Sequence, residues 1–131
     1  MSQQAVYDVD FKDEQLLLEA LKEMGYNPIV NNKGQELRTY GRQKSVKAHI
    51  IIPKEQGNFT YADLGFERTD NGFKLHADHT DINKLNLAQL KQRYTKAFIN
   101  KRIKLMGTQY LMGNEEIDQN GTMKLKVKVM E

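Results

Sequence analysis

Residues 84–104, KLNLAQLKQRYTKAFINKRIK, hold seven lysines or arginines and no aspartate or glutamate. The apolar residues of this stretch recur at steps of three and four, which places them on one side of a helix and leaves the cations on the rest of its surface. Such a helix packs by its apolar stripe and presents a positive field to water or to a partner. The stripe consists of Leu87, Leu90, Tyr94, Ala97, Phe98 and Leu105, and we expect its members Leu87, Leu90, Tyr94 and Phe98 to be core.

Capping residues predict where this helix and a second helix begin and end. Asn86, with Gln89 three residues later, is typical of a capping box at the start of the basic helix, and Gly107 is expected to end it. A second amphipathic helix is predicted after Asp13, which suits an N-cap, with Gly25 just past its end. Two amphipathic helices need an apolar surface to cover, and one face of a sheet offers it.

Strands account for the other apolar segments. The Asn31–Gly34 and Arg68–Gly72 segments have turn chemistry, and residues 31–46 form the only long stretch without a period. The element order is therefore strand, helix, four strands, helix and two strands. It predicts an α+β fold in which both helices pack on one face of an antiparallel sheet of about five to seven strands. The predicted strands span residues 5–11, 26–30, 48–52, 58–67, 72–77, 110–115 and 122–129.

Composition narrows the class of protein. The 131 residues fit one domain, predicted to span 1–131, and include no cysteine, so disulfides and thiol chemistry are excluded. No stretch approaches the roughly 20 apolar residues of a membrane helix, and the N-terminus has no secretory pattern. A cytoplasmic protein without membrane partners is expected. The net charge of +3 divides into −4 for residues 1–25 and +7 for the remainder, a separation that favours an acidic partner or self-association.

Several short motifs occur along the chain, namely Gly25-Tyr26, Tyr40-Gly41-Arg42, Gly65-Phe66, Ala77-Asp78, Gln92-Arg93-Tyr94 and Gly121. In their order and spacing, these motifs resemble the hypothetical chloroplast open reading frame thirty-five family, an uncharacterised domain of unknown function in plastids, cyanobacteria, other bacteria and viruses. The resemblance implies a small α+β domain and brings no established activity, substrate or catalytic residue. The family typically continues its Ala-Asp motif with tryptophans, whereas His79 follows here.

The candidate chemical site is the segment with His76, Asp78 and His79. Imidazoles and carboxylates at this spacing are possible ligands of zinc, manganese or iron, and His49 on a neighbouring strand is a possible further ligand. The alternative is a polar strand end that leads into a helix cap. No metalloprotease, deaminase, phosphate-loop or nucleophile-elbow motif is present. We therefore expect no enzyme and no cofactor, and we assign no catalytic or metal residue, while a metal-dependent enzyme at this segment stays open as an alternative.

Binding is the function that the charge pattern favours. We expect a non-catalytic interaction module that binds an acidic partner, either a protein or its own copy as a homo-oligomer, through the basic helix and the basic loop around Tyr40. A nucleic-acid-binding protein that uses the same cations for phosphates and Tyr40 for stacking on a base is the alternative. The residues assigned to partner binding are Arg38, Tyr40, Arg42, Lys44, Lys91, Arg93, Lys96, Lys101 and Arg102.

Overall fold

The computed structural model of the protein describes residues 3–41 and 46–113. The chain forms two compact units, Met1–Tyr94 and Thr95–Glu131. This division does not decide whether residues 1–131 act as one domain, which stays a prediction.

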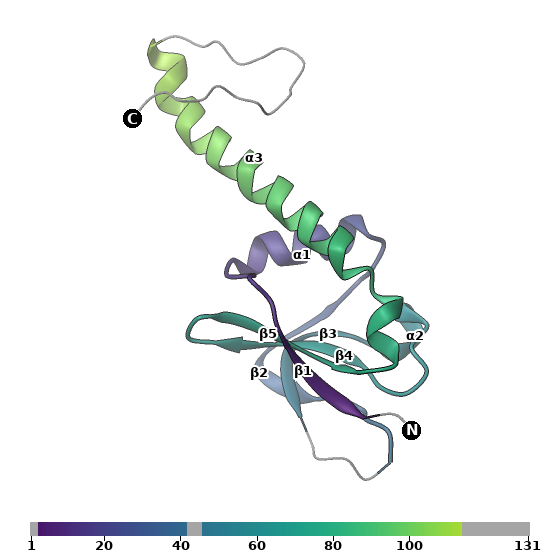
Figure 1. The fold of residues 1–131 in the computed structure, drawn as a ribbon. Coiled ribbons are helices and arrows are strands. Elements are labelled where there is room, and N and C mark those ends of the chain that lie inside the picture. Colours follow the sequence, from purple (N-terminus) through teal and green to yellow (C-terminus); the bar gives the residue numbers. More distant parts are fainter. Residues whose placement is uncertain (1–2, 42–45, 114–131) are drawn as a thin grey trace. The chain divides into compact units, whose positions relative to one another are not determined.

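The first unit contains a five-stranded antiparallel sheet with the strand order β1-β5-β4-β3-β2. Helix α1 and the first turns of α3 lie over one face of this sheet (Figure 1). The predicted α+β fold is therefore confirmed. The elements in chain order are β1 Gln4–Asp8, α1 Glu14–Glu23, β2 Ile29–Glu36, β3 Lys47–Ile52, α2 Lys54–Gly57, β4 Leu64–Thr69, β5 Gly72–Asp78, the 3-10 turn η1 Asp81–Lys84, and α3 Leu87–Gly113.

Helix α1 forms as predicted because its ends and its buried face are both encoded locally. The side chain of Asp13 accepts a hydrogen bond from the backbone nitrogen of Leu16 at 3.1 Å, which satisfies one N–H group of the first turn. Leu17 and Leu21, four residues apart, are fully buried. Gly25 follows with φ 96°, a left-handed conformation that glycine adopts without steric cost.

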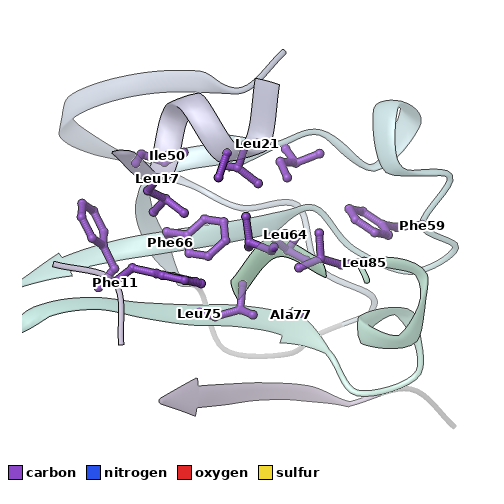
Figure 2. Packing of buried hydrophobic residues seen from close by; sticks show 14 residues of the cluster. Phe11, Leu17, Leu21, Ile50, Phe59, Leu64, Phe66, Leu75, Ala77 and Leu85 are labelled. Atoms are coloured by element: carbon purple, nitrogen blue, oxygen red, sulfur yellow. The ribbon is translucent and has the colours of Figure 1, made fainter. Parts of the chain in front are cut away.

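The core of the first unit lies between α1 and the sheet. Figure 2 shows Leu17 and Leu21 of α1 on the side of the sheet that carries Phe66 of the central strand β4 and Leu75 of its neighbour β5. Burying one such side chain stabilises the fold by about 1.5–3 kcal/mol, so this cluster is the main favourable contribution to folding. Its buried members are Phe11, Leu17, Ala20, Leu21, Ile50, Ile52, Phe59, Leu64, Phe66, Phe73, Leu75, Ala77, Leu85 and Leu90.

The first turns of α3 belong to the same core. Leu90 is fully buried, and Leu87 and Tyr94 pack against the cluster from the same helix. The side chain of Asn86 accepts a hydrogen bond from the backbone nitrogen of Gln89 at 3.0 Å, so the predicted start of this helix is confirmed. Both amphipathic helices therefore cover the same face of the sheet within this unit, as predicted.

The predicted turn at Asn31–Gly34 is wrong, because these residues lie inside strand β2. Strand β2 pairs with β3 before and after this segment, with a register shift between Val30 and Gln35. Gly34 has φ 88°, so residues with turn chemistry produce a bulge-like irregularity within a strand rather than a chain reversal. The irregular stretch predicted for residues 31–46 is correspondingly shorter.

The predicted end of the basic helix at Gly107 is also wrong, because α3 continues to Gly113. A glycine inside a helix costs only about 1 kcal/mol relative to alanine, which good helix formers on both sides offset. The strand predicted for residues 110–115 is wrong at residues 110–113, which are helical. The rest of the predicted closing hairpin, residues 114–129, lies outside the described residues.

A close approach between strands restricts position 65 to glycine. A Cβ on Gly65 would stand 2.5 Å from the Cβ of Ala48 and 2.9 Å from a methyl group of Leu37. We expect Gly65→Ala to lower the free energy of unfolding by about 2 kcal/mol, since overpacked sites cost roughly 1–3 kcal/mol. Urea denaturation measures the loss.

The change Ala48→Gly provides the matched control for this prediction, because it removes the nearer of the two contacts with the new methyl group. The double variant should therefore lose less free energy of unfolding than the sum of the two single losses. Strictly additive losses would show that the contact between positions 48 and 65 is not the cause.

Candidate interaction surfaces

Arg38, a predicted partner-binding residue, is held by two carboxylates. Its Nε lies 3.1 Å from both side-chain oxygens of Asp63, and its terminal nitrogens donate to Glu55 at 2.6 and 3.0 Å. Its backbone N–H also donates to Asp63 at 2.8 Å. Arg38 thus links the segment after β2 to α2 and to the residue before β4. Its guanidinium group is therefore engaged in ion pairs that stabilise the fold.

Two buried carboxylates, Asp63 and Asp81, fix the loop between α2 and β4. Asp81 is 2% exposed and accepts hydrogen bonds from the backbone nitrogens of residues 60–62 at 2.8, 2.7 and 3.1 Å. Asp63 is 5% exposed and accepts from the backbone nitrogen of Lys54 in addition to Arg38. Full hydrogen bonding is what allows charged groups to be buried at this depth.

These contacts also correct the start of one predicted strand. Residues 58–67 were expected to be extended throughout, but β4 begins at Leu64. The reason is that the N–H groups of residues 60–62 donate to Asp81 and not to a neighbouring strand. Local sequence did not indicate this loop, because Asp81 lies 21 residues from the first of its partners.

Tyr61, in the loop between α2 and β4, lies beside Tyr40, which follows β2. The rings of Tyr40 and Tyr61 are 5.1 Å apart between centroids and meet edge to face at 81°. Tyr40 is half exposed, at 51%. The sequence pointed to Tyr40 but not to Tyr61. The position of Tyr61 depends on a hydrogen bond from its backbone nitrogen to Asp81, 20 residues away. Arg42 and Lys44, the other two residues assigned to this loop, lie outside the described residues.

The first turns of α3 fasten this helix to the start of α1. The hydroxyl of Tyr94 accepts hydrogen bonds from the backbone nitrogens of Lys12 and Asp13 at 3.0 and 2.9 Å. Arg93, a predicted partner-binding residue, forms an ion pair with Glu23 at 3.0 Å. The charge of Arg93 is therefore paired with a carboxylate of the same unit, whereas Lys91 is exposed at the surface.

The part of α3 in the second unit carries both cations and exposed apolar side chains. Lys96, Lys101 and Arg102 are all exposed. Phe98 is 43% exposed, so the prediction that it is core is wrong, and Leu105 is 62% exposed. Among the described residues of α3, those in or against the core cluster are Leu87, Leu90 and Tyr94.

Each of the three residues of the histidine segment makes a contact within the fold, although Nδ1 of His76 and Oδ2 of Asp78 are buried with no hydrogen-bond partner among the described residues. His76 is 7% exposed and its Nε2 lies 2.8 Å from a carboxylate oxygen of Glu67. A side-chain oxygen of Asp78 accepts from the backbone nitrogen of Thr80, and Nδ1 of His79 lies 3.0 Å from the backbone of Gln3. In residues 3–41 and 46–113, no group of three or more histidines and carboxylates is arranged to hold a metal ion.

The fourth candidate ligand lies elsewhere on the sheet. Nδ1 of His49 accepts a hydrogen bond from the backbone nitrogen of Arg68 at 2.9 Å. This contact links β3 to β4 and gives the imidazole a structural partner. Among the helices that the structure describes, none has the length and apolarity needed to cross a bilayer.

Comparison with known proteins identifies a family. A family model described as "Protein of unknown function (DUF1257)" matches residues 20–126. The chain belongs to the DUF1257 family. The DUF1257 match includes Arg38, Tyr40 and the whole of α3, and so contains every residue assigned to partner binding. No curated protein matches the chain, and no solved structure does.

The carboxylate of Asp81 gives the first prediction for this region. Asp81→Asn replaces one acceptor oxygen with an N–H donor that faces backbone N–H groups, so we expect the free energy of unfolding to fall by about 3 kcal/mol. Thermal and urea unfolding measure the loss. Asp70→Asn, in the exposed turn between β4 and β5, should change stability by less than about 0.5 kcal/mol. Equal effects of the two changes would contradict the role given to Asp81.

The ion pair of Arg38 gives the second prediction. Hydrogen bonding to Arg38 lowers the pKa of Glu55 from 4.5 to about 2. The pair therefore contributes stability above pH 4.5, which is lost as the pH falls through about 2. In Arg38→Gln, the pKa of Glu55 should return toward 4.5, as NMR titration of the Glu55 carboxyl carbon would measure. Arg68→Gln should leave the Glu55 pKa at its low value, and a Glu55 titration unmoved by Arg38→Gln would contradict the assignment.

Proposed function

We propose that this DUF1257 chain is a non-catalytic interaction module that binds an acidic protein. The proposed surface consists of cations on α3, and a separate proposed contact is the exposed ring of Tyr40 beside Tyr61. For α3, the cationic surface is defined by Lys91, Lys96, Lys101, Arg102 and Lys104, all of them exposed.

The observation that carries the proposal is the absence of acid from a long helix. Helix α3 has 27 residues and its sequence contains no aspartate or glutamate. Cations three or four residues apart, such as Lys101 and Lys104, repel each other and weaken a helix, whereas alternating Glu and Lys would strengthen it. A helix that needed only to be soluble would gain from mixed charges. A helix whose charged side chains are all cationic presents a positive field that favours an acidic partner.

The loop around Tyr40 adds a second feature that favours binding. Tyrosine and arginine are enriched among the residues that dominate protein interfaces. Tyr40 is exposed beside Tyr61, and Arg38 is held in place by Asp63 and Glu55. A fixed aromatic pair loses little side-chain entropy when a partner covers it.

Two finer assignments belong to the same proposal. We propose that the chain is a member of the hypothetical chloroplast open reading frame thirty-five family, on the strength of its short motifs and their order, and that it works inside the cell.

A second copy of the chain is one acceptable acidic partner, because residues 1–25 carry a net charge of −4. Nucleic acid is the alternative, since the cations of α3 also suit phosphates.

An affinity capture with charge-reversed chains tests the proposal. Immobilised full-length protein is incubated with nuclease-treated lysate of the source cells, and the captured proteins are quantified by mass spectrometry. We expect the variant Lys91→Glu/Lys96→Glu/Lys101→Glu to lose most of the acidic proteins that the wild type retains, because its surface now repels them. Capture should also weaken as salt is raised.

The matched control carries the same charge change on the first unit, Lys22→Glu/Lys33→Glu/Lys74→Glu, at three exposed positions. It should retain the wild-type partners. Identical partner sets for the two triple variants would reject the proposed surface. Binding of RNA or DNA that weakens steeply between two salt concentrations, with no protein captured, would favour the nucleic-acid alternative.

A further inference from the structure

One face of α3 combines two apolar side chains with two cations. Phe98, Lys101, Arg102 and Leu105 follow the spacing i, i+3, i+4 and i+7, which brings them to the same side of a helix. We call this set the 98–105 face. It lies wholly within the second unit.

The apolar members of this face are open to solvent. Phe98 is 43% exposed and Leu105 is 62% exposed. The guanidinium carbon of Arg102 lies 6.0 Å from the centre of the Phe98 ring, which is within the range of a cation–π contact. The arginine therefore stands beside the ring, where its charge is available to a ligand that also covers the aromatic side chain.

We propose that the 98–105 face binds an acidic amphipathic helix of another protein, an inference that rests on the proposed function. Leu105 lies two helical turns, about 10.5 Å, beyond Phe98. A partner helix with apolar residues seven apart offers a contact to each. Carboxylates between those apolar residues would meet Lys101 and Arg102. The spacing of Phe98 and Leu105 thus favours a helical partner, and the charges of Lys101 and Arg102 favour an acidic one.

Other occupants fit this face less well. A phosphate backbone satisfies the cations but offers no apolar surface to bury Leu105. A second copy of α3 would place Lys101 and Arg102 against cations of the same kind. A lipid surface favours a broad apolar face, whereas here the two cations separate Phe98 from Leu105.

A binding assay with a synthetic probe tests this inference. The probe is a fluorescein-labelled peptide of about 22 residues, rich in alanine, with leucine at every seventh position and glutamates between the leucines. Its fluorescence anisotropy is titrated with the full-length chain at low salt. The wild type should bind this probe at least about tenfold more tightly than a second probe with glutamine in place of glutamate.

Matched variants separate this face from the rest of α3. Leu105→Ala and Lys101→Glu should each weaken binding of the acidic probe about tenfold. Ile99→Ala removes another exposed apolar side chain, 38% exposed, and Lys96→Glu reverses another exposed charge, both on other sides of the helix. These two controls should change the affinity less than about threefold. Far-UV circular dichroism confirms that the helix is retained in all four variants.

The outcomes distinguish the two proposals. Equal weakening by Lys96→Glu and Lys101→Glu, with no effect of Leu105→Ala, would support a general cationic surface and overturn the 98–105 face. No binding of the acidic probe by the wild type at low salt would overturn both proposals. Tighter binding to single-stranded RNA or to anionic phosphatidylserine vesicles than to the probe would overturn the choice of a protein helix as the partner.

Discussion

The packing of α1 against strands β4 and β5 is the interaction on which the rest of the first unit depends. Leu17 and Leu21 share one core cluster with Phe66 and Leu75. Leu90 of α3 belongs to the same cluster. Because the hydroxyl of Tyr94 then binds backbone groups at the start of α1, the two helices are held to each other as well as to the sheet.

Three buried polar side chains, Asp81, Asp63 and His76, hold neighbouring segments of the first unit together. Asp81 takes the place of a strand partner for three consecutive backbone N–H groups, and Asp63 joins a guanidinium to two backbone nitrogens. His76 is paired with Glu67. The proposed function is therefore placed on the exposed surface and not on these buried side chains.

The sequence predicted elements whose signals are local. Helix α1 follows from Asp13, a three-and-four spacing and Gly25, and the strands β3 and β5 follow from their composition. The missed features depend on distant residues: β4 starts late because of Asp81. Likewise, the spacing of Phe98 and Leu105 revealed a stripe on a helix, but a stripe does not say whether its own chain covers it. For this reason the sequence predicted a buried Phe98, whereas the structure exposes this side chain.

The register shift in β2 has a consequence for the edge of the sheet. Strand β2 is an edge strand, and the backbone N–H and C=O groups of an edge strand can pair with a strand of another chain. The displacement between Val30 and Gln35, with Gly34 in a left-handed conformation, interrupts the regular ladder that such pairing requires. The irregular edge therefore disfavours the addition of a sixth strand on this side.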